Sequence, residues 1–349
     1  MTQNKMKNIF KVFLKISIII GIIFIYLCIV FDDNFKDFKS NSFKSLRIFD
    51  GKKSTNEHKF NIFFVETNEN KTKLTSKDSC AIESAALNNP DALVFYYSKN
   101  VVIDKNLLNR YKNIQTRKLI VEDIFKNTPF FSLWKKLVIG SYSLNHLSDA
   151  LRLALIWKYG GIYLDTDIIT IKSLRIILNF PGIGAYSESA ANNAVIVYPK
   201  NHPFINQTMI EFTKNYNPNC FDCHGPRLIT RVFNDYCKTN NLYYTNLLTK
   251  KKVYDKLTGS LNRNIENNLE CNNMFVYPIN YFYPIAWQKY GTLFKTDSKL
   301  DKEIFIDSFG VHFWNKMSKK DYTKSGDGSI YDYFSSKNCP SIKNINFMK

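Results

Sequence analysis

Two aspartates separated by one residue, Asp165 and Asp167, follow directly after a short apolar run. Their carboxylate oxygens are the ligands that a hard cation such as Mn²⁺ or Mg²⁺ prefers, and one or two carboxylates suffice when a bound diphosphate supplies further oxygens. A cation held in this way stabilises the charge that grows on a departing nucleotide diphosphate. Because Asp-x-Asp alone is common in surface loops, its meaning depends on the residues around it.

The neighbouring sequence places two more polar side chains close to the aspartate pair. Residues 145–159 repeat apolar side chains at three- and four-residue spacing, which predicts a helix that ends at two glycines. The short buried strand 162–164 then folds back along this helix. The helix rises about 15 Å beyond Asp149, and the strand returns about 10 Å. We therefore expect the pair to lie near Asp149 and Arg152, which share one helical face.

Phosphatases of the haloacid-dehalogenase type also place Asp-x-Asp after a buried strand. Their motif continues with Thr or Val two positions after the second aspartate, and in this chain Ile169 occupies that position. The mismatch disfavours this class of enzyme.

The elements before the pair indicate the fold class. Residues 61–66 and 92–97 are apolar runs typical of buried strands, and residues 78–87 between them favour a helix. Strand, helix and strand in this order predict a βαβ unit, and hence an α/β fold with a parallel sheet. Ligands of such open sheets bind outside the carboxyl ends of the strands, where the aspartate pair is expected.

A membrane anchor is predicted at residues 12–31, an apolar run of 20 residues. At about 1.5 Å per residue, such a helix spans about 30 Å, the thickness of a bilayer core. No small-residue cleavage site follows, which favours an anchor over a cleaved signal peptide. Basic residues flank both ends, so charge does not settle the orientation. Residues 32–59 are predicted to be a stem, and the folded body begins near residue 60.

The cysteines and glycosylation sequons indicate an oxidising compartment. Six of the seven cysteines lie beyond the anchor, an even number compatible with disulfides, and sequons begin at Asn70 and Asn206. Cys220 and Cys223 could instead form half of a zinc site, but no second pair follows at zinc-like spacing. Disulfides are therefore favoured, and the sequence does not specify their pairing.

The net charge of +18 would permit a nucleic-acid partner, but the lysines are mostly scattered along an Asn-rich chain. The predicted anchor and lumenal body argue against that partner.

Residues 146–174, HLSDALRLALIWKYGGIYLDTDIITIKSL, closely resemble the corresponding block of the alpha-1,4-glycosyltransferases. The resemblance extends over about residues 60–318 through further blocks in the expected order, at residues 79–86, 191–194, 202–204, 225–231, 282–285 and 311–316. It implies a glycosyltransferase-A-like (Rossmann-type) domain with a mostly parallel sheet, preceded by a transmembrane helix and stem. It also implies a single-pass type II Golgi membrane protein, with residues 1–11 cytoplasmic and the catalytic domain, residues 60–349, lumenal.

The resemblance implies a retaining, metal-dependent transferase. The donor would be a UDP-sugar carrying galactose, N-acetylgalactosamine or N-acetylglucosamine, and the cofactor Mn²⁺ or Mg²⁺. The acceptor would be a galactose- or hexosamine-terminated glycan, extended in alpha-1,4 linkage, with a glycolipid such as lactosylceramide favoured. An alternative is a non-catalytic descendant that binds sugars or partners in the Golgi membrane; the intact aspartate pair and Arg152 favour the enzyme.

Roles follow from the resemblance residue by residue. Asp167 is expected to bind the metal directly, and Asp165 to bind the ribose, or the metal through water. Asp149 and Arg152 are expected at the donor, with Arg152 able to make a bidentate phosphate contact. His312 is either a late metal ligand or a core histidine, and both alternatives stay open.

Four further residues are candidates with equally open alternatives. Asn192 and Asn193 are expected to hydrogen-bond the transferred sugar, or else to shape a loop. Trp314 offers an apolar face to a sugar, or else belongs to the core. Glu188 is a catalytic carboxylate candidate near the reacting centre, where the sequence does not decide between a nucleophile and front-face attack.

Overall fold

The structure, a computed structural model, describes residues 60–187, 189–238, 271, 274–296, 301–319, 321 and 325–342. All of them belong to one unit of the chain, residues 56–349. The predicted tail, anchor and stem, residues 1–59, lie outside the described residues. Within the described ranges, no helix combines the length and apolar character needed to cross a bilayer.

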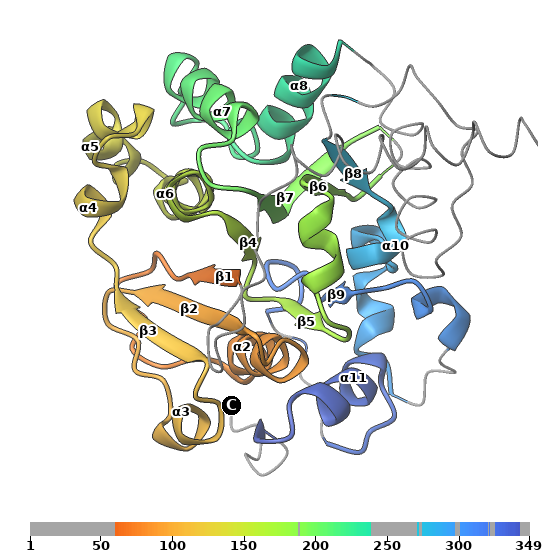
Figure 1. Ribbon diagram of the computed structural model, residues 1–349. Helices are drawn as coiled ribbons and strands as arrows, with labels where there is room; N and C mark the ends of the chain where they lie inside the picture. The colour runs from red at the N-terminus through yellow and green to blue at the C-terminus, as the bar shows by residue number, and fades with distance from the viewer. Residues whose placement is uncertain are drawn as a thin grey trace, which may run out of the picture. The chain divides into compact units, whose positions relative to one another are not determined.

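Seven described strands form one sheet in the order β3-β2-β1-β4-β7-β6-β8 (Figure 1). Four of the six pairings between these described strands are parallel, and β7 runs antiparallel to both β4 and β6. The expected α/β fold with a mostly parallel sheet is confirmed. The strands span β1 Phe60–Val65, β2 Ala92–Ser98, β3 Ile114–Lys118, β4 Gly161–Leu164, β6 Gly182–Ala185, β7 Ala191–Tyr198 and β8 Phe275–Tyr277.

The predicted βαβ unit is formed by β1, α2 (Ser76–Asn88) and β2, with the two strands parallel. Thr75 caps the start of helix α2, because its side chain accepts a hydrogen bond from the backbone N–H of Asp78. The Asp78 carboxylate in turn accepts from the N–H of Thr75, which completes a capping box. This reciprocal cap fixes where the chain turns from β1 into the helix.

Helices cover both faces of the sheet. Helices α6 (Ser143–Tyr159), α7 (Pro203–Lys214) and α8 (Pro226–Cys237) lie on one side and α2 on the other (Figure 1). Side chains of β1 alternate between two cores, with Phe63 packed in the α6 cluster and Phe64 in the α2 cluster. A strand buried on both faces reads as a continuous apolar run, as residues 62–65 do. The remaining α-helices are α3 Lys105–Arg110, α4 Val121–Phe125, α5 Trp134–Leu137, α10 Ile279–Phe282 and α11 Ile330–Asn338, and short 3₁₀ turns span Pro129–Ser132, Arg175–Asn179, Trp287–Leu293 and Lys302–Phe305.

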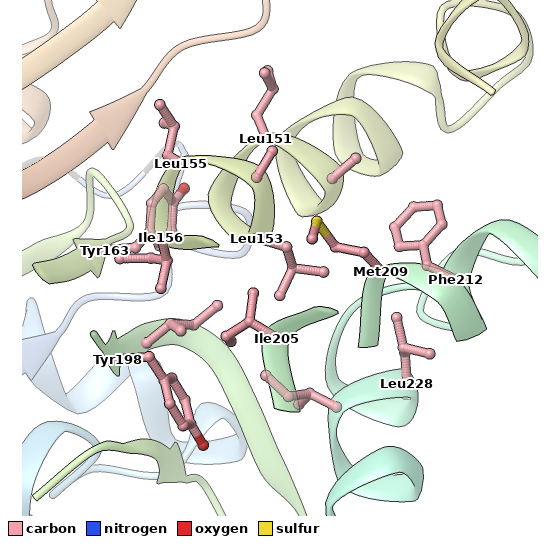
Figure 2. Close-up of a cluster of buried hydrophobic side chains, with 14 of the residues drawn as sticks. Leu151, Leu153, Leu155, Ile156, Tyr163, Tyr198, Ile205, Met209, Phe212 and Leu228 are labelled. Atoms are coloured by element: carbon pink, nitrogen blue, oxygen red, sulfur yellow. The ribbon is translucent and has the colours of Figure 1, made fainter. Parts of the chain in front are cut away.

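Helix α6 is the central helix of its layer. Figure 2 shows Leu153 directed toward Ile205 and Met209 of α7, and all three side chains are buried. Leu151 on the same helix is fully buried as well. A helix that is apolar over most of its circumference is held from several sides. Its polar residues are therefore carried on a rigid support.

Two glycines end α6 and return the chain into β4. Gly160 and Gly161 have φ angles of 66° and 117°, which favour glycine. A Cβ on Gly161 would lie 2.4 Å from the carbonyl oxygen of Asn61, so a side chain has no room there. The predicted helix, two-glycine turn and strand are confirmed.

A separate two-stranded ladder joins β5 (Ile168–Thr170) to β9 (Gly310–His312). The strands are antiparallel, and Ile168 is paired with His312. The ladder therefore brings a late segment of the chain beside the aspartate pair.

Three disulfides connect the described cysteines: Cys80–Cys339, Cys220–Cys223 and Cys237–Cys271. The preference for disulfides over a zinc site at Cys220 and Cys223 is confirmed, because both thiols are used.

Candidate active site

Asp165 leaves the carboxyl end of β4, at the edge of the sheet where ligands of α/β folds bind. Its backbone N–H donates to the carbonyl of Ala194 at 3.0 Å, which extends the pairing with β7 by one residue. Its Oδ1 accepts a 2.8 Å hydrogen bond from the Tyr163 hydroxyl and lies 3.1 Å from Nη1 of Arg152. The carboxylate is thus oriented by two neighbours while its side chain stays 28% exposed.

Asp167 is more enclosed than Asp165. Its Oδ2 accepts a 2.8 Å hydrogen bond from the backbone N–H of Asn315. Its Oδ1 is buried and makes no hydrogen bond with the described residues, although Nε2 of His312 lies 3.3 Å away as a potential ion pair. Burial raises the pKa of Asp167, and His312 opposes that shift. A buried carboxylate oxygen without a donor is costly unless something else binds it.

His312 reaches this position through the β5–β9 ladder, which the N–H of Phe313 extends by donating to the carbonyl of Asp167 at 2.8 Å. Its Nδ1 accepts a 3.2 Å hydrogen bond from the N–H of Trp314, so Nε2 faces the aspartates. One ligand atom from each of Asp165, Asp167 and His312 lies within 4.8 Å of the others. Two carboxylates, one of them with an unbonded buried oxygen, and an imidazole suit a divalent cation such as Mn²⁺.

Asp149 and Asn193 form a second polar pair beside the metal-type cluster. Nδ2 of Asn193 donates to Oδ1 of Asp149 at 2.7 Å, and both residues are buried. Burial raises the pKa of Asp149, while Arg152 and Asn193 oppose the shift. Gly225 packs against the pair, because a Cβ there would lie 3.1 Å from Oδ2 of Asp149.

Arg152 ties α6 to the ends of two strands. Its Nη1 donates to the carbonyl of Asn193 at 2.8 Å and contacts Asp165, while Nη2 donates to the hydroxyl of Ser148 at 3.0 Å. Its guanidinium lies 4.7 Å from the Tyr163 ring centroid. Burial alone would lower the pKa of Arg152, but Asp165 and Tyr163 outweigh it, so the pKa is raised and the charge is kept. Because these donors are occupied, the bidentate phosphate contact stays a prediction.

The predicted polar cluster is therefore assembled. Arg152 lies 3.4 Å from Asp149 and 3.1 Å from Asp165, and Asp167 shares the metal-type geometry with Asp165. The roles assigned to these residues remain predictions.

The other candidates differ in what surrounds them. Asn192 is half-buried, and its Oδ1 accepts from the N–H of Ala194 at 3.1 Å. Trp314 is also half-buried; its indole N–H donates to the carbonyl of Ile285 at 3.0 Å, and its ring lies 4.2 Å from that of His312. Glu188 lies outside the described residues. The sugar contacts of Asn192 and Trp314 and the catalytic role of Glu188 stay predictions.

Two residues near the site were missed from the sequence. Tyr163 stands two positions before Asp165 in an extended segment, and this spacing could have placed both on one face. Lys77 on α2 donates to the carbonyl of Ser318 at 2.6 Å, and burial lowers its pKa to about 8. The spacing of residues in the sequence gives no signal of the contact between Lys77 and Ser318, because it joins distant parts of the chain.

Comparison with known families gives two matches that together cover most of the body. The family described as "Alpha 1,4-glycosyltransferase conserved region" matches residues 197–255 and 251–346. The family described as "Glycosyltransferase sugar-binding region containing DXD motif" matches residues 75–190, which include the aspartate pair.

Individual relatives match over most of their length. Lactosylceramide 4-alpha-galactosyltransferase of Gorilla gorilla gorilla is 30% identical over 294 residues, covering 80% of this chain and 82% of the relative. Alpha-1,4-N-acetylglucosaminyltransferase of Homo sapiens is 29% identical over 318 residues, covering 86% and 83%. Among solved structures, the PaToxG glycosyltransferase is similar with a TM-score of 0.42 and 20% identity, over 61% of this chain and 84% of that one.

Proposed function

The chain belongs to the alpha-1,4-glycosyltransferase family and is a glycosyltransferase, and from this premise we propose that it transfers a hexose from a UDP-sugar to a glycan with retention of configuration. The sugar would be galactose, N-acetylgalactosamine or N-acetylglucosamine, joined in alpha-1,4 linkage to a terminal galactose or hexosamine. Several relatives carry the name lactosylceramide 4-alpha-galactosyltransferase, which supports a glycolipid acceptor such as lactosylceramide.

The convergence of Asp165, Asp167 and His312 is the observation that carries the metal-dependent part of the proposal. These three residues would hold Mn²⁺ or Mg²⁺, with the unbonded Oδ1 of Asp167 as one ligand. When bound, the cation supplies the positive charge that stabilises a departing UDP. Ligation through Nε2 of His312 would place the imidazole proton on Nδ1, the atom that faces the N–H of Trp314.

The surrounding residues would position the donor. Arg152 and Tyr163 orient Asp165, so that it is preorganised to bind the ribose or the metal. Asn193 near the start of β7 is bonded to Asp149 of α6, and in this proposal both contact the transferred sugar. Asn192 and Trp314 would contribute further sugar contacts, and Glu188 a carboxylate near the reacting centre.

UDP release by the full chain in detergent tests the proposal. The assay uses Mn²⁺ and each of the three UDP-sugars with methyl β-lactoside as acceptor, before and after EDTA. One donor should be turned over, and Asp167→Asn should lower turnover by about 100-fold or more, the size of effect seen when a group that stabilises transition-state charge is lost. Asp91→Asn changes a half-buried carboxylate that pairs with Arg175 outside the cluster, and it should keep wild-type turnover. If the folded protein neither turns over nor binds any of the donors, the proposal is refuted in favour of the non-catalytic alternative.

We also propose that the protein is a single-pass type II protein of the Golgi membrane. Residues 1–11 would be cytoplasmic, 12–31 the anchor and 32–59 the stem, with the catalytic domain 60–349 in the lumen. The disulfides of the described residues support an oxidising compartment.

A further inference from the structure

A cleft of about 480 Å³ lies along the exposed side of α8 and the turn between β6 and β7. Its lining includes Tyr186 from that turn and Arg227, Thr230, Arg231 and Asn234 from α8. None of these residues belongs to the metal-type cluster or to its supporting contacts. The cleft is therefore distinct from the metal-type cluster.

The cleft adjoins the residues that support the candidate donor site. Oγ1 of Thr230 accepts a 3.0 Å hydrogen bond from the N–H of Ala191, the first residue of β7. Asn193, two residues further along this strand, holds Asp149. Gly225 lies between the two sites, because it immediately precedes α8 and a Cβ on it would lie 3.1 Å from Oδ2 of Asp149. A ligand in the cleft thus lies next to the place where the transferred sugar would be bound.

The lining has the composition of a carbohydrate site. Arg227, Arg231 and Asn234 offer planar groups with several N–H donors, which can bind neighbouring hydroxyls of one sugar ring. Tyr186 is half-buried and adds an aromatic surface with a polar end. A few directed polar groups beside an aromatic side chain are typical of small-molecule sites that set orientation.

The charges of the cleft favour a neutral ligand. Nε of Arg227 lies 3.0 Å from Asp222, and Nη2 of Arg231 lies 3.3 Å from Glu211. Each arginine charge is thus already balanced by a carboxylate. These arginine side chains are 62% and 44% exposed, and ion pairs at such sites are weak, so their N–H groups can turn toward a hydroxyl.

We propose that this cleft binds the terminal sugars of a neutral acceptor glycan, an assignment that rests on the proposed function. The acceptor lies along α8 and presents its terminal hydroxyl toward the start of β7. Tyr186 supports a sugar ring, and Arg227 and Arg231 bind its hydroxyl groups.

Ligand-detected NMR titration of methyl β-lactoside into the full chain, with UDP and Mn²⁺ present, tests this site without requiring turnover. Tyr186→Ala and Arg231→Ala should each weaken lactoside binding at least tenfold, and Tyr186→Phe should retain most of it. The matched control is Arg175→Ala, which removes another exposed arginine paired with a carboxylate, Asp91, on a 3₁₀ turn outside the cleft. It should bind within twofold of wild type.

The possible results separate this assignment from the proposed function. Lactoside binding that needs Tyr186 and Arg231, in a protein without transferase activity, supports the cleft and refutes the function. Transfer with equal lactoside affinity in wild type and both alanine variants overturns the cleft, as does the absence of lactoside binding to wild type. Tighter binding of 3′-sialyllactoside than of methyl β-lactoside overturns the neutral ligand. In an active enzyme, the ratio of transfer to UDP-sugar hydrolysis should also fall at least tenfold in the alanine variants.

Discussion

Nδ2 of Asn193 donates a 2.7 Å hydrogen bond to Oδ1 of Asp149, and this contact joins the start of β7 to the first half of α6. It links the support of the candidate donor site to the strand beside the proposed acceptor cleft. Loss of this hydrogen bond should therefore disturb the structure that supports the donor site and the cleft.

Asn193→Ala should lower the free energy of unfolding by about 1–3 kcal/mol, because a buried carboxylate oxygen loses a strong donor. Urea unfolding at pH 7 measures the change. Asn192→Ala is the matched control, since the Asn192 side chain is half-buried and accepts its bond from the backbone N–H of Ala194 rather than donating to a buried carboxylate. Equal stability of Asn193→Ala and wild type would show that the contact contributes little.

Mn²⁺ binding should depend on the carboxylate of Asp167. Electron paramagnetic resonance of the full chain titrated with Mn²⁺ should show a site that Asp167→Asn weakens by more than about tenfold, since changes around metal ligands commonly cost 10–100-fold. Cys220, Asp222 and Cys223 form another close group, but the cysteines are joined as a disulfide and offer no thiolates. Asp222→Asn should therefore leave Mn²⁺ binding unchanged. An equal loss of Mn²⁺ affinity in both variants would contradict the assignment of Asp167 as a ligand.

Packing around α6 should dominate the stability of its layer. Leu151 is fully buried, and Leu151→Ala should cost about 2–5 kcal/mol of unfolding free energy through lost contacts and a cavity. Leu144 on the same helix is 46% exposed, so Leu144→Ala should stay within about 0.5 kcal/mol of wild type. Chemical unfolding of the two variants makes the comparison. Similar costs at both positions would contradict the central burial of α6.

His224 should make the protein less stable in mild acid. It is 2% exposed, and burial, with smaller effects of His146 and Arg231, lowers its pKa to about 4 from 6.5. Below pH 6.5 this histidine is protonated in the unfolded chain but stays neutral in the folded protein. The free energy of unfolding therefore falls as the pH falls toward 4. Between pH 7.5 and 5 this histidine should remove about 2 kcal/mol.

Urea unfolding of wild type and His224→Gln at both pH values isolates this contribution. The variant should lose less stability than wild type on acidification, whatever its stability at pH 7.5. Parallel losses in the two proteins would assign the acid sensitivity to other groups.

Asn70 should carry a glycan if the body is lumenal. It is exposed on the turn after β1, and Thr72 of its sequon is exposed too. In the second sequon Thr208 is fully buried and bonded to the carbonyl of Phe204, so a glycan at Asn206 would be more crowded. A mobility shift on glycosidase treatment, lost in Asn70→Gln and kept in Asn206→Gln, is the expected result. A chain from its native host without any shift would count against the lumenal orientation.

The local parts of the fold could be predicted because each carries its own signal. The α6 helix, the two-glycine turn and β4 follow from apolar spacing and from glycines that no other residue replaces. From those three elements, simple helix and strand lengths place Asp149 near Asp165. About twenty contiguous residues were thus enough to predict that these polar side chains lie close together.

The contacts made by late segments could not be predicted in the same way. Strand β9 is three residues long, and nothing in its sequence names β5 as its partner. Resemblance alone brought His312 into consideration, because pairing between short distant strands leaves no periodic signal. The pairing of Cys80 with Cys339 is equally a property of the folded chain.

The Cys80–Cys339 disulfide has a consequence for biosynthesis. The other two disulfides among the described residues join cysteines 3 and 34 positions apart, whereas this one spans 259. During translation, the thiol of α2 emerges early and meets four other cysteines before its own partner leaves the ribosome. It must stay reduced, or exchange out of wrong pairs, until Cys339 is made. The segment that carries Cys339 therefore decides whether the thiol of Cys80 is oxidised correctly, and a product truncated before Cys339 leaves that thiol open to mixed disulfides.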